Sequence, residues 1–370
     1  MSSHTLVVKA GTGVLLKGTA ALDRPNIARL LNELIDAREQ GRRVIFVSSG
    51  AIGAGLAPLG FKRRPVTIPD LQACAAVGQS LLMQAYNEVL AQRGYVVAQL
   101  LLTYDDFQDR RRYLNLRNTL AGLQDRRVLP IINENDTISI DEIRFGDNDV
   151  LSALVASAVD AALTIVLSDV AGLYTANPRV DPTARLIPVV EGVTPEIEAL
   201  AGVPDSAVGV GGMASKIRAA KTITSMGGTL VVADGKKASV TAILGGGIER
   251  GEVAGTVFRP SGDRLDHRKR WIAHTLKEQG ELIVDAGAAR ALVERGKSLL
   301  PAGVIGCEGH FVEGDPVVVW HDDRRIAKGL TNYSADQVRQ IMGKKSSEIA
   351  GLLGGKIFDE VIHRNNMVRL

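Results

Sequence analysis

Residues 5–13 carry the sequence TLVVKAGTG, an apolar run rich in β-branched side chains that ends in a lysine and a glycine turn. This run predicts a buried β-strand over residues 5–10. Apolar side chains then recur at helical spacing, at positions 27, 30, 31, 34 and 35. They predict a helix whose apolar face packs on a sheet.

The alternation of short strand patterns and longer helical patterns continues to about residue 257. Further strands are expected at residues 44–48, 96–102, 128–133, 162–167 and 229–233. Such an alternation favours a mainly parallel sheet that is covered by helices. The first domain, residues 1–258, is therefore predicted to have an α/β fold.

A change of sequence character after residue 258 predicts a second domain. Basic residues cluster without apolar periodicity at positions 264–270, which indicates a linker over residues 259–279. Short strand patterns follow at residues 282–284, 304–305, 316–320 and 326–330, with helical patterns at 286–294 and 334–342. They favour a small β-rich, barrel-like domain over residues 280–356 and a loosely packed C-terminal tail over 357–370.

The composition is typical of a globular protein with two domains. Hydrophobic residues make up 45% and charged residues 23% of the 370 residues, which suffices for a buried core. The net charge of +3 is too small to predict binding to nucleic acid or to an anionic membrane. Two distant cysteines favour a reducing compartment, the cytoplasm, over disulfides or a zinc site. The most apolar long segment, 151–167, contains Asp160, so no membrane span is expected.

Two candidate anion sites follow the first two predicted strands. Lys9 ends the first strand, and the glycine turn after it lets backbone amides approach an anion, with Gly11 as an expected donor. The run SSGAIGAG, residues 48–55, follows the second strand and leaves N–H groups free at a helix start. An exposed strand-end lysine and a tight strand-to-helix turn are the structural alternatives.

Two further polar segments adjoin predicted helix starts. Residues 133–136, NEND, and 146–149, GDND, hold more acidic and amide groups than the capping of one helix needs, which favours binding of an ammonium group. The loop 209–216, GVGGMASK, places Lys216 in the first turn of a helix, where a cation opposes the helix dipole unless an anion is bound. A capping role and a solvated lysine are the alternatives. Because open α/β sheets bind ligands at the carboxyl ends of their strands, we expect these segments at one edge of the sheet.

Several common catalytic motifs are missing from the sequence. No segment matches GxxxxGK[ST], no GxGxxG follows the first strand, and HRD with DFG does not occur. HExxH and GxSxG are absent as well, which disfavours a zinc hydrolase or a serine hydrolase. An enzyme that handles phosphate must therefore use a different cradle.

Together the polar segments resemble the amino acid kinase family. Six ordered motifs carry the resemblance: VK at 8–9 with its glycine turn, VSSGAI at 47–52, INEND at 132–136, GDND at 146–149, SD at 168–169 with GLYT at 172–175, and GGMASK at 211–216. The segment from about 281 to 354 resembles the PUA domain. The resemblance implies a three-layer α/β/α sandwich in which ATP and an acceptor meet above the sheet, followed along the chain by a small PUA-like barrel.

The resemblance also implies roles for single residues. Lys9 and Lys216 would contact the transferred phosphoryl group, and Asp149 would hold both lysines in place. The acceptor would be bound by Ser49, Gly50, Asp136 and Asn148. ATP would be bound by Lys9, Ser168, Asp169, Val210, Gly211, Gly212, Met213, Ala214, Ser215 and Lys216, and no residue is assigned to a metal. The chain departs from the family pattern at Ala10, Gly13, Ser168 and Val210, which bears on fine contacts with the nucleotide.

Among the members of the family, the chain is most similar to those that phosphorylate glutamate. The resemblance therefore implies ATP-dependent phosphorylation of the γ-carboxylate of L-glutamate, with Mg²⁺ as cofactor, as the first step of proline biosynthesis in the cytoplasm. It also implies feedback inhibition by proline, a homo-oligomer such as a dimer or tetramer, and transfer of the product to glutamyl phosphate reductase. RNA binding by the PUA-like domain and an inactive amino-acid sensor are the alternative functions.

Overall fold

A computed structural model of the chain describes residues 4–18, 20–124, 126–138, 148–178, 180–200, 212–248, 253–260, 269, 272, 276–353 and 358–370. The chain divides into two compact units, Met1–Arg264 and Leu265–Leu370. Each unit buries a hydrophobic core of its own. Within the described ranges, no helix combines the length and the apolar character that crossing a membrane requires.

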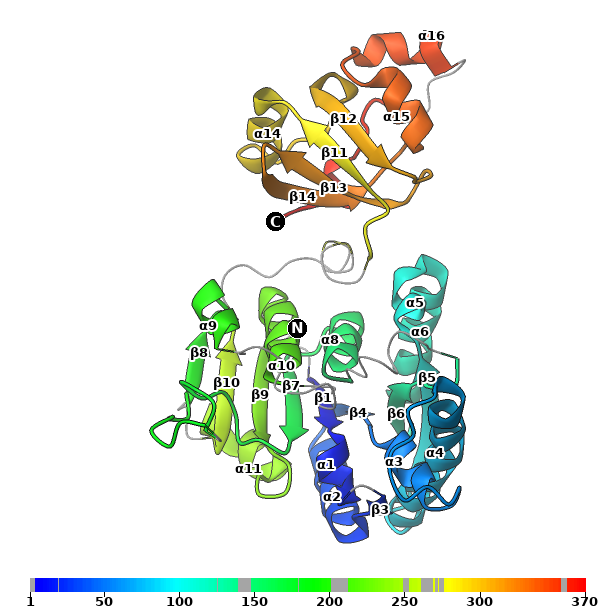
Figure 1. Cartoon of the computed structure of the whole chain (residues 1–370), viewed down its shortest axis with the longest axis vertical. Coiled ribbons are helices and arrows are strands. Elements are labelled where there is room, and N and C mark those ends of the chain that lie inside the picture. The colour runs from blue at the N-terminus through cyan, green and yellow to red at the C-terminus, as the bar shows by residue number, and fades with distance from the viewer. Residues whose placement is uncertain are drawn as a thin grey trace. The chain divides into compact units, whose positions relative to one another are not determined.

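The first unit is built around a sheet of eight strands (Figure 1). In the order in which they lie side by side, the strands are β5 (Val96–Leu102), β6 (Val128–Glu134), β4 (Arg43–Val47), β1 (Thr5–Ala10), β7 (Leu163–Ser168), β9 (Thr229–Asp234), β10 (Gly255–Arg259) and β8 (Val189–Glu191). β1 pairs in parallel with β4 and β7, and every one of its residues is buried. A strand buried on both faces is typical of a parallel sheet that helices cover on both sides.

The prediction of a mainly parallel sheet is confirmed, and all of the predicted strands of this unit are present. Within the described sheet, only the pairing of β10 with β9 is antiparallel. The sequence does not predict β8 and β10. β8 is three residues long, which is too short for an alternating pattern to appear.

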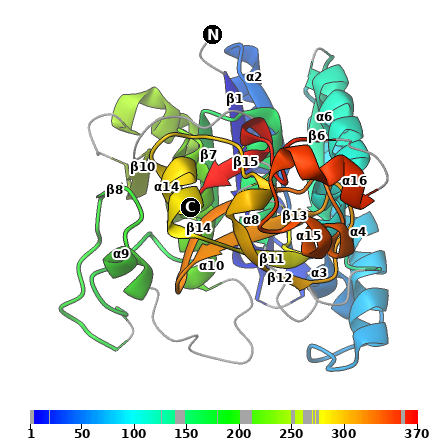
Figure 2. The same cartoon turned by 90° about the horizontal axis from the view of Figure 1, so that it is seen from above.

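The helices of this unit form two groups that pack on the sheet, as a three-layer sandwich requires. The first group is α2 (Arg24–Glu39), α3 (Ala51–Leu56), α4 (Ile68–Ala91) and α11 (Val240–Ala242), and the second is α6 (Arg110–Gln124), α8 (Asn148–Val159) and α10 (Met213–Ser225). Figure 1 shows α2 and α4 in the lower half of the unit and α8 and α10 in its upper half. Seen from above, the unit extends from β8 and α9 (Pro195–Ala199) to α4 and α6 (Figure 2). The shorter elements are α1 (Thr12–Leu15), β2 (Leu16–Lys17), β3 (Ala21–Leu22), α5 (Tyr104–Gln108) and the π-helix η1 (Ile243–Gly247).

The second unit holds a five-stranded sheet, in agreement with the predicted small β-rich domain. Its strands lie in the order β12 (Val304–Gly309), β11 (Gly280–Val284), β13 (Pro316–His321), β14 (Arg324–Leu330) and β15 (Met367–Arg369). The helices are α14 (Ala286–Val293), α15 (Ala335–Ile341) and α16 (Ile349–Leu353), with the 3-10 turns η2 (Pro301–Gly303), η3 (Ser346–Glu348) and η4 (Arg364–Asn366).

The end of the chain differs from the predicted loose tail. β15 pairs with β14 in antiparallel register, and Val361 and Ile362 are fully buried. Residues 358–370 therefore add an edge strand to the sheet, through a pairing between distant segments that local composition does not reveal. The predicted linker, residues 259–279, lies largely outside the described residues.

α3 and α4 touch through their backbones. A Cβ atom added to Gly55 would lie 1.9 Å from the carbonyl oxygen of Cys74, and one added to Gly78 would lie 1.8 Å from the carbonyl oxygen of Ala51. Carbon and oxygen atoms that are not bonded do not approach this closely, so only glycine fits at these two positions. The contact fixes the spacing between α4 and the helix that opens at Gly50.

We expect Gly78→Ala to lower the free energy of unfolding by about 1–3 kcal/mol, because α3 and α4 must move apart to admit the methyl group. Chemical denaturation measures the change. Gly122→Ala in α6 is the matched control, since a Cβ atom there lies 3.9 Å from its nearest neighbour, on Arg126. That variant should be more stable than the parent by about 0.5–1 kcal/mol. Equal denaturation midpoints for the two variants would contradict the backbone contact.

Candidate functional site

The ends of the parallel strands define one edge of the first sheet. β1, β4, β6 and β7 run in parallel and end at Ala10, Val47, Glu134 and Ser168. Their carboxyl ends therefore lie at the same edge, where open α/β sheets bind ligands. The predicted site residues that the structure describes lie at or just after these strand ends, or at the start of α8 and α10.

The structure brings Lys9, Asp149 and Lys216 together at this edge. The Nζ atom of Lys9 lies 2.5 Å from Oδ1 of Asp149, and the Nζ atom of Lys216 lies 3.0 Å from Oδ2 of the same carboxylate. Lys9 is 7% exposed, Lys216 is 3% exposed and Asp149 is fully buried. The alternatives of an exposed strand-end lysine and a solvated lysine are therefore wrong for both positions. We call these three residues the lysine–aspartate bridge.

The charges of the bridge govern the ionisation of Asp149. Burial alone would raise the pKa of Asp149, but the positive charges of Lys9 and then Lys216, with their hydrogen bonds, outweigh it and hold the pKa well below the usual value. The hydroxyl group of Ser215 lies 2.9 Å from Oδ2 of Asp149 and also 2.8 Å from the carbonyl oxygen of Gly212. Asp149 is thus a carboxylate that is surrounded by donors from two other segments of the chain.

Asp149→Asn tests the bridge through stability. Removing one partner of a buried ion pair typically costs about 3–5 kcal/mol, so the variant should unfold more easily at neutral pH. Because the pKa of Asp149 is lower in the folded than in the unfolded state, its stabilisation is present above the ordinary aspartate pKa of about 3.9 and is lost as the pH falls. The difference in unfolding free energy between parent and variant should therefore shrink below about pH 4.

The control for this experiment is Asp36→Asn. Asp36 pairs with Arg93 at 2.9 Å but its side chain is 45% exposed, and exposed pairs contribute up to about 1 kcal/mol. A cost for Asp149→Asn that is as small as that of the control, or that does not depend on pH, would contradict a buried charged bridge.

Of the residues assigned to the acceptor, Asn148 directly precedes Asp149 of the bridge and contacts Ser49. The amide nitrogen Nδ2 of Asn148 is 2.7 Å from the carbonyl oxygen of Ser48 and 3.0 Å from Oγ of Ser49. It also lies 2.8 Å from Oδ1 of Asn133, a residue of the NEND segment for which the sequence predicted no individual role. Asp136 is half-buried in the turn that follows β6. The start of α8 therefore contacts the ends of β4 and β6.

Gly50 and Gly11, two glycines at this edge, differ in backbone conformation and in hydrogen bonding. Gly50 has φ +86°, a left-handed conformation that favours glycine, and it is the N-cap of α3 without a side chain that caps the helix. Gly11 was expected to offer its amide to an anion, but its N–H donates to the carbonyl oxygen of Leu167 at 2.9 Å. That expectation is wrong because the turn after β1 continues its pairing with β7.

The residues assigned to ATP are only partly within the described structure. Ser168 ends β7, and its hydroxyl group lies 3.0 Å from Oδ1 of the exposed Asp169. Gly212 is the N-cap of α10, which places Met213, Ala214, Ser215 and Lys216 in the first turn of that helix. Val210 and Gly211, like Gly146 and Asp147 of the GDND segment, lie outside the described residues. Among the described residues, no three histidine, cysteine or acidic side chains form a group that could hold a metal ion.

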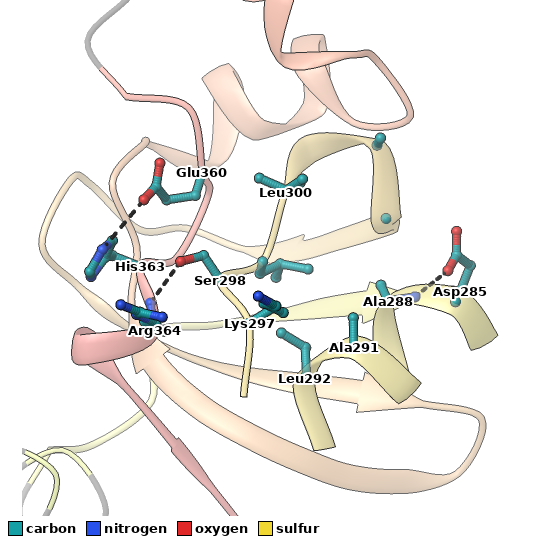
Figure 3. A pocket seen from close by; sticks show the side chains of 14 residues that line it. Asp285, Ala288, Ala291, Leu292, Lys297, Ser298, Leu300, Glu360, His363 and Arg364 are labelled. Carbon is teal, nitrogen blue, oxygen red and sulfur yellow. Dashed lines mark hydrogen bonds and ion pairs between the residues drawn. The ribbon is translucent and has the colours of Figure 1, made fainter. Parts of the chain in front are cut away.

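A separate pocket of about 670 Å³ lies within the second unit (Figure 3). Ala288, Ala291 and Leu292 of α14 form part of its apolar lining. Figure 3 shows Glu360, His363 and Arg364 on one side of the pocket, Asp285 on the other and Lys297 between them. Nε2 of His363 lies 3.7 Å from Oε1 of Glu360. Basic and acidic groups both line the pocket, so its charge does not select one kind of ligand. It contains none of the predicted site residues.

Comparison with known proteins identifies the class of this protein. Residues 4–234 match the Amino acid kinase family, and residues 280–353 match the PUA domain. The chain therefore belongs to the amino acid kinase family and carries a PUA domain at its C-terminal side. The two matched segments fall within the two compact units of the structure.

Several full-length relatives carry one name, glutamate 5-kinase. The protein of that name from Moorella thermoacetica is 48% identical over 370 residues, which cover 100% of this chain and 97% of the relative. The one from Trichlorobacter lovleyi is 48% identical over 98% of this chain and 96% of its own length. The one from Geobacter sulfurreducens is 48% identical over 99% of this chain and 97% of its own length.

Proposed function

We propose that this chain transfers the γ-phosphoryl group of ATP to the γ-carboxylate of L-glutamate and so forms L-glutamyl 5-phosphate, the first step of proline biosynthesis. The names of full-length relatives at 48% identity support this reaction. The observation that carries the proposal is the lysine–aspartate bridge, because it holds two buried ammonium groups at the carboxyl edge of the sheet. Residues 1–258 would bind both substrates.

The chemistry of the acceptor explains why positively charged donors would suffice for catalysis without a general base. A glutamate side chain has an ordinary pKa of about 4.3, so its carboxylate is already ionised at neutral pH and needs no general base. Catalysis of phosphoryl transfer then consists of positioning and of offsetting charge on the phosphoryl oxygens. An ammonium group has three N–H donors, and among the described residues Lys9 gives one to Asp149. In the proposed mechanism its other donors contact phosphoryl oxygens, while Asp149 keeps the ammonium in position.

The described residues fit a magnesium ion that the nucleotide itself largely holds. Mg²⁺ usually binds one or two carboxylates together with the phosphates of the substrate. Asp169 is an exposed carboxylate at the carboxyl end of β7 and would supply such a ligand. When bound, the ion would offset negative charge on the triphosphate.

The acidic and amide groups beside the bridge suit an acceptor that carries a free amino group. An ammonium group binds best to a carboxylate with neutral oxygen acceptors around it, as Asp136 and Asn148 would provide. N-acetylglutamate lacks this charge, and a nucleoside monophosphate would call for arginines that the motifs do not contain. Glutamate is therefore the acceptor that we propose over either of these.

We expect Lys216→Ala to lower kcat about 100-fold or more while the KM for glutamate changes little, because removal of one donor to the developing charge has this effect in other enzymes. The assay couples ADP release to trapping of the acyl phosphate with hydroxylamine. Lys221→Ala is the control, since Lys221 lies on the same helix but is exposed and pairs with Glu198. An unchanged kcat in Lys216→Ala would remove Lys216 from the mechanism.

Asp136→Asn should raise the KM for glutamate roughly 10-fold or more, since a charged hydrogen bond to the substrate ammonium becomes a neutral one, while the KM for ATP stays the same. The acceptors to compare are glutamate, aspartate, N-acetylglutamate and UMP. Equal use of free and N-acetylated glutamate by the parent protein would refute the assignment of the acceptor.

Further parts of the proposal rest on the same family relationship. We propose a cytoplasmic homo-oligomer, a dimer or tetramer, that proline inhibits and that passes its labile product to glutamyl phosphate reductase. RNA binding is not proposed as the main function, because acidic side chains dilute any basic surface of the PUA domain. These side chains are Glu308, Glu313, Asp315, Asp322 and Asp323.

A further inference from the structure

A chain of three side-chain amides connects α4 to the acceptor side of the site. The Nδ2 atom of Asn133 donates to Oε1 of Gln79 at 2.8 Å, and Nδ2 of Asn148 donates to Oδ1 of Asn133 at 2.8 Å. Gln79 is 8% exposed and Asn133 is 1% exposed, so the two amides farthest from the acceptor are buried. Gln79 lies in the middle of α4 and belongs to none of the six sequence motifs.

Backbone groups fix the direction of the amides of Asn133 and Asn148, and Asn133 in turn fixes that of Gln79. Oδ1 of Asn133 accepts from the backbone N–H of Glu134 at 3.0 Å, so the oxygen of Asn133 cannot exchange places with its nitrogen. The Nδ2 atom of Asn133 must then face Gln79, which presents its oxygen. Nδ2 of Asn148 faces the backbone carbonyl of Ser48 at 2.7 Å, which fixes the amide of Asn148 in the same way.

With the amides oriented in this way, one polar atom at each end of the series of three amides has no hydrogen-bond partner among the described residues. Among the described residues, Oδ1 of Asn148 and Nε2 of Gln79 are buried and have no hydrogen-bond partner. The oxygen of Asn148 is an acceptor that a ligand with N–H donors would satisfy. An amide that pointed the other way would offer such a ligand an NH₂ group instead.

We propose that Gln79 is a positioning residue for the acceptor: through Asn133 it holds the amide of Asn148 with Oδ1 offered to the ammonium group of the amino-acid substrate. The inference rests on the proposed function, and it names the residues that would make the acceptor site selective for a substrate with a free amino group. Without the Gln79 oxygen, Nδ2 of Asn133 would lose its acceptor in a buried site. The Asn133 side chain would then turn away from Asn148, so the Asn148 amide would keep the carbonyl oxygen of Ser48 but lose Oδ1 of Asn133, and its Oδ1 atom would be held less firmly.

The test compares glutamate with glutarate, which has both carboxylates but no amino group. Affinities are measured by calorimetry on the full-length chain, so that the result does not depend on turnover. Gln79→Met removes the acceptor oxygen at similar size and should lower the ratio of glutamate to glutarate affinity roughly 10-fold, with kcat for glutamate within about twofold of the parent. Gln79→Glu keeps an acceptor for Asn133 and should retain most of the ratio.

Gln84→Met is the matched control. Gln84 lies on the same helix, but it is exposed and donates to Glu88, so this variant should keep the parent ratio. An unchanged ratio in Gln79→Met overturns the inference, as does an equal loss for both ligands, which would indicate a merely structural role. If Gln79→Met does not fold, a folded Gln79→Glu that loses the ratio overturns it as well. A parent that neither binds nor phosphorylates glutamate would refute the proposed function, which is a separate outcome.

Discussion

The buried carboxylate of Asp149 is the point on which the site depends. Two ammonium groups cannot lie this close together in a protein interior unless a negative charge separates them. The two lysines come from β1 and α10, 140 residues before and 67 residues after Asp149 in the sequence. A single side chain at the start of α8 therefore holds the first strand and a late helix in one arrangement.

The fold makes this arrangement possible by collecting strand ends. Parallel strands must be joined by crossover connections, and these return each new strand to the sheet with its carboxyl end at the same edge. Polar residues that are far apart in the chain thereby become neighbours. On one flank of Asp149, Asn148 contacts the end of β4, and on the other, Ser215 in the first turn of α10 contacts Asp149 itself; these flanks would be the acceptor side and the nucleotide side of the proposed site.

The sequence predicted the central strands, the second domain and the two lysines of the bridge, and there are physical reasons why it did not predict the remaining features. β-branched runs and helical periods are local, so they predicted the central strands and the second domain. Lys9 and Lys216 stood beside glycines at element ends, where the chemistry is easily recognised. Gln79 gave no such indication, because one polar residue within the pattern of α4 is ordinary on a helix. β15 and the use of the Gly11 amide depend on pairings between distant segments, which no local pattern encodes.

The glycine contact between α3 and α4 has a consequence for how the acceptor side responds to change elsewhere. Gly78 directly precedes Gln79, and its partner Ala51 directly follows Gly50 at the end of the serine-rich turn. Main-chain atoms in van der Waals contact leave no slack between these two points. The distance between Gln79 and the turn at Gly50 is thus set by contact between main chains, and repacking of side chains on the outer face of α4 would leave it unaltered.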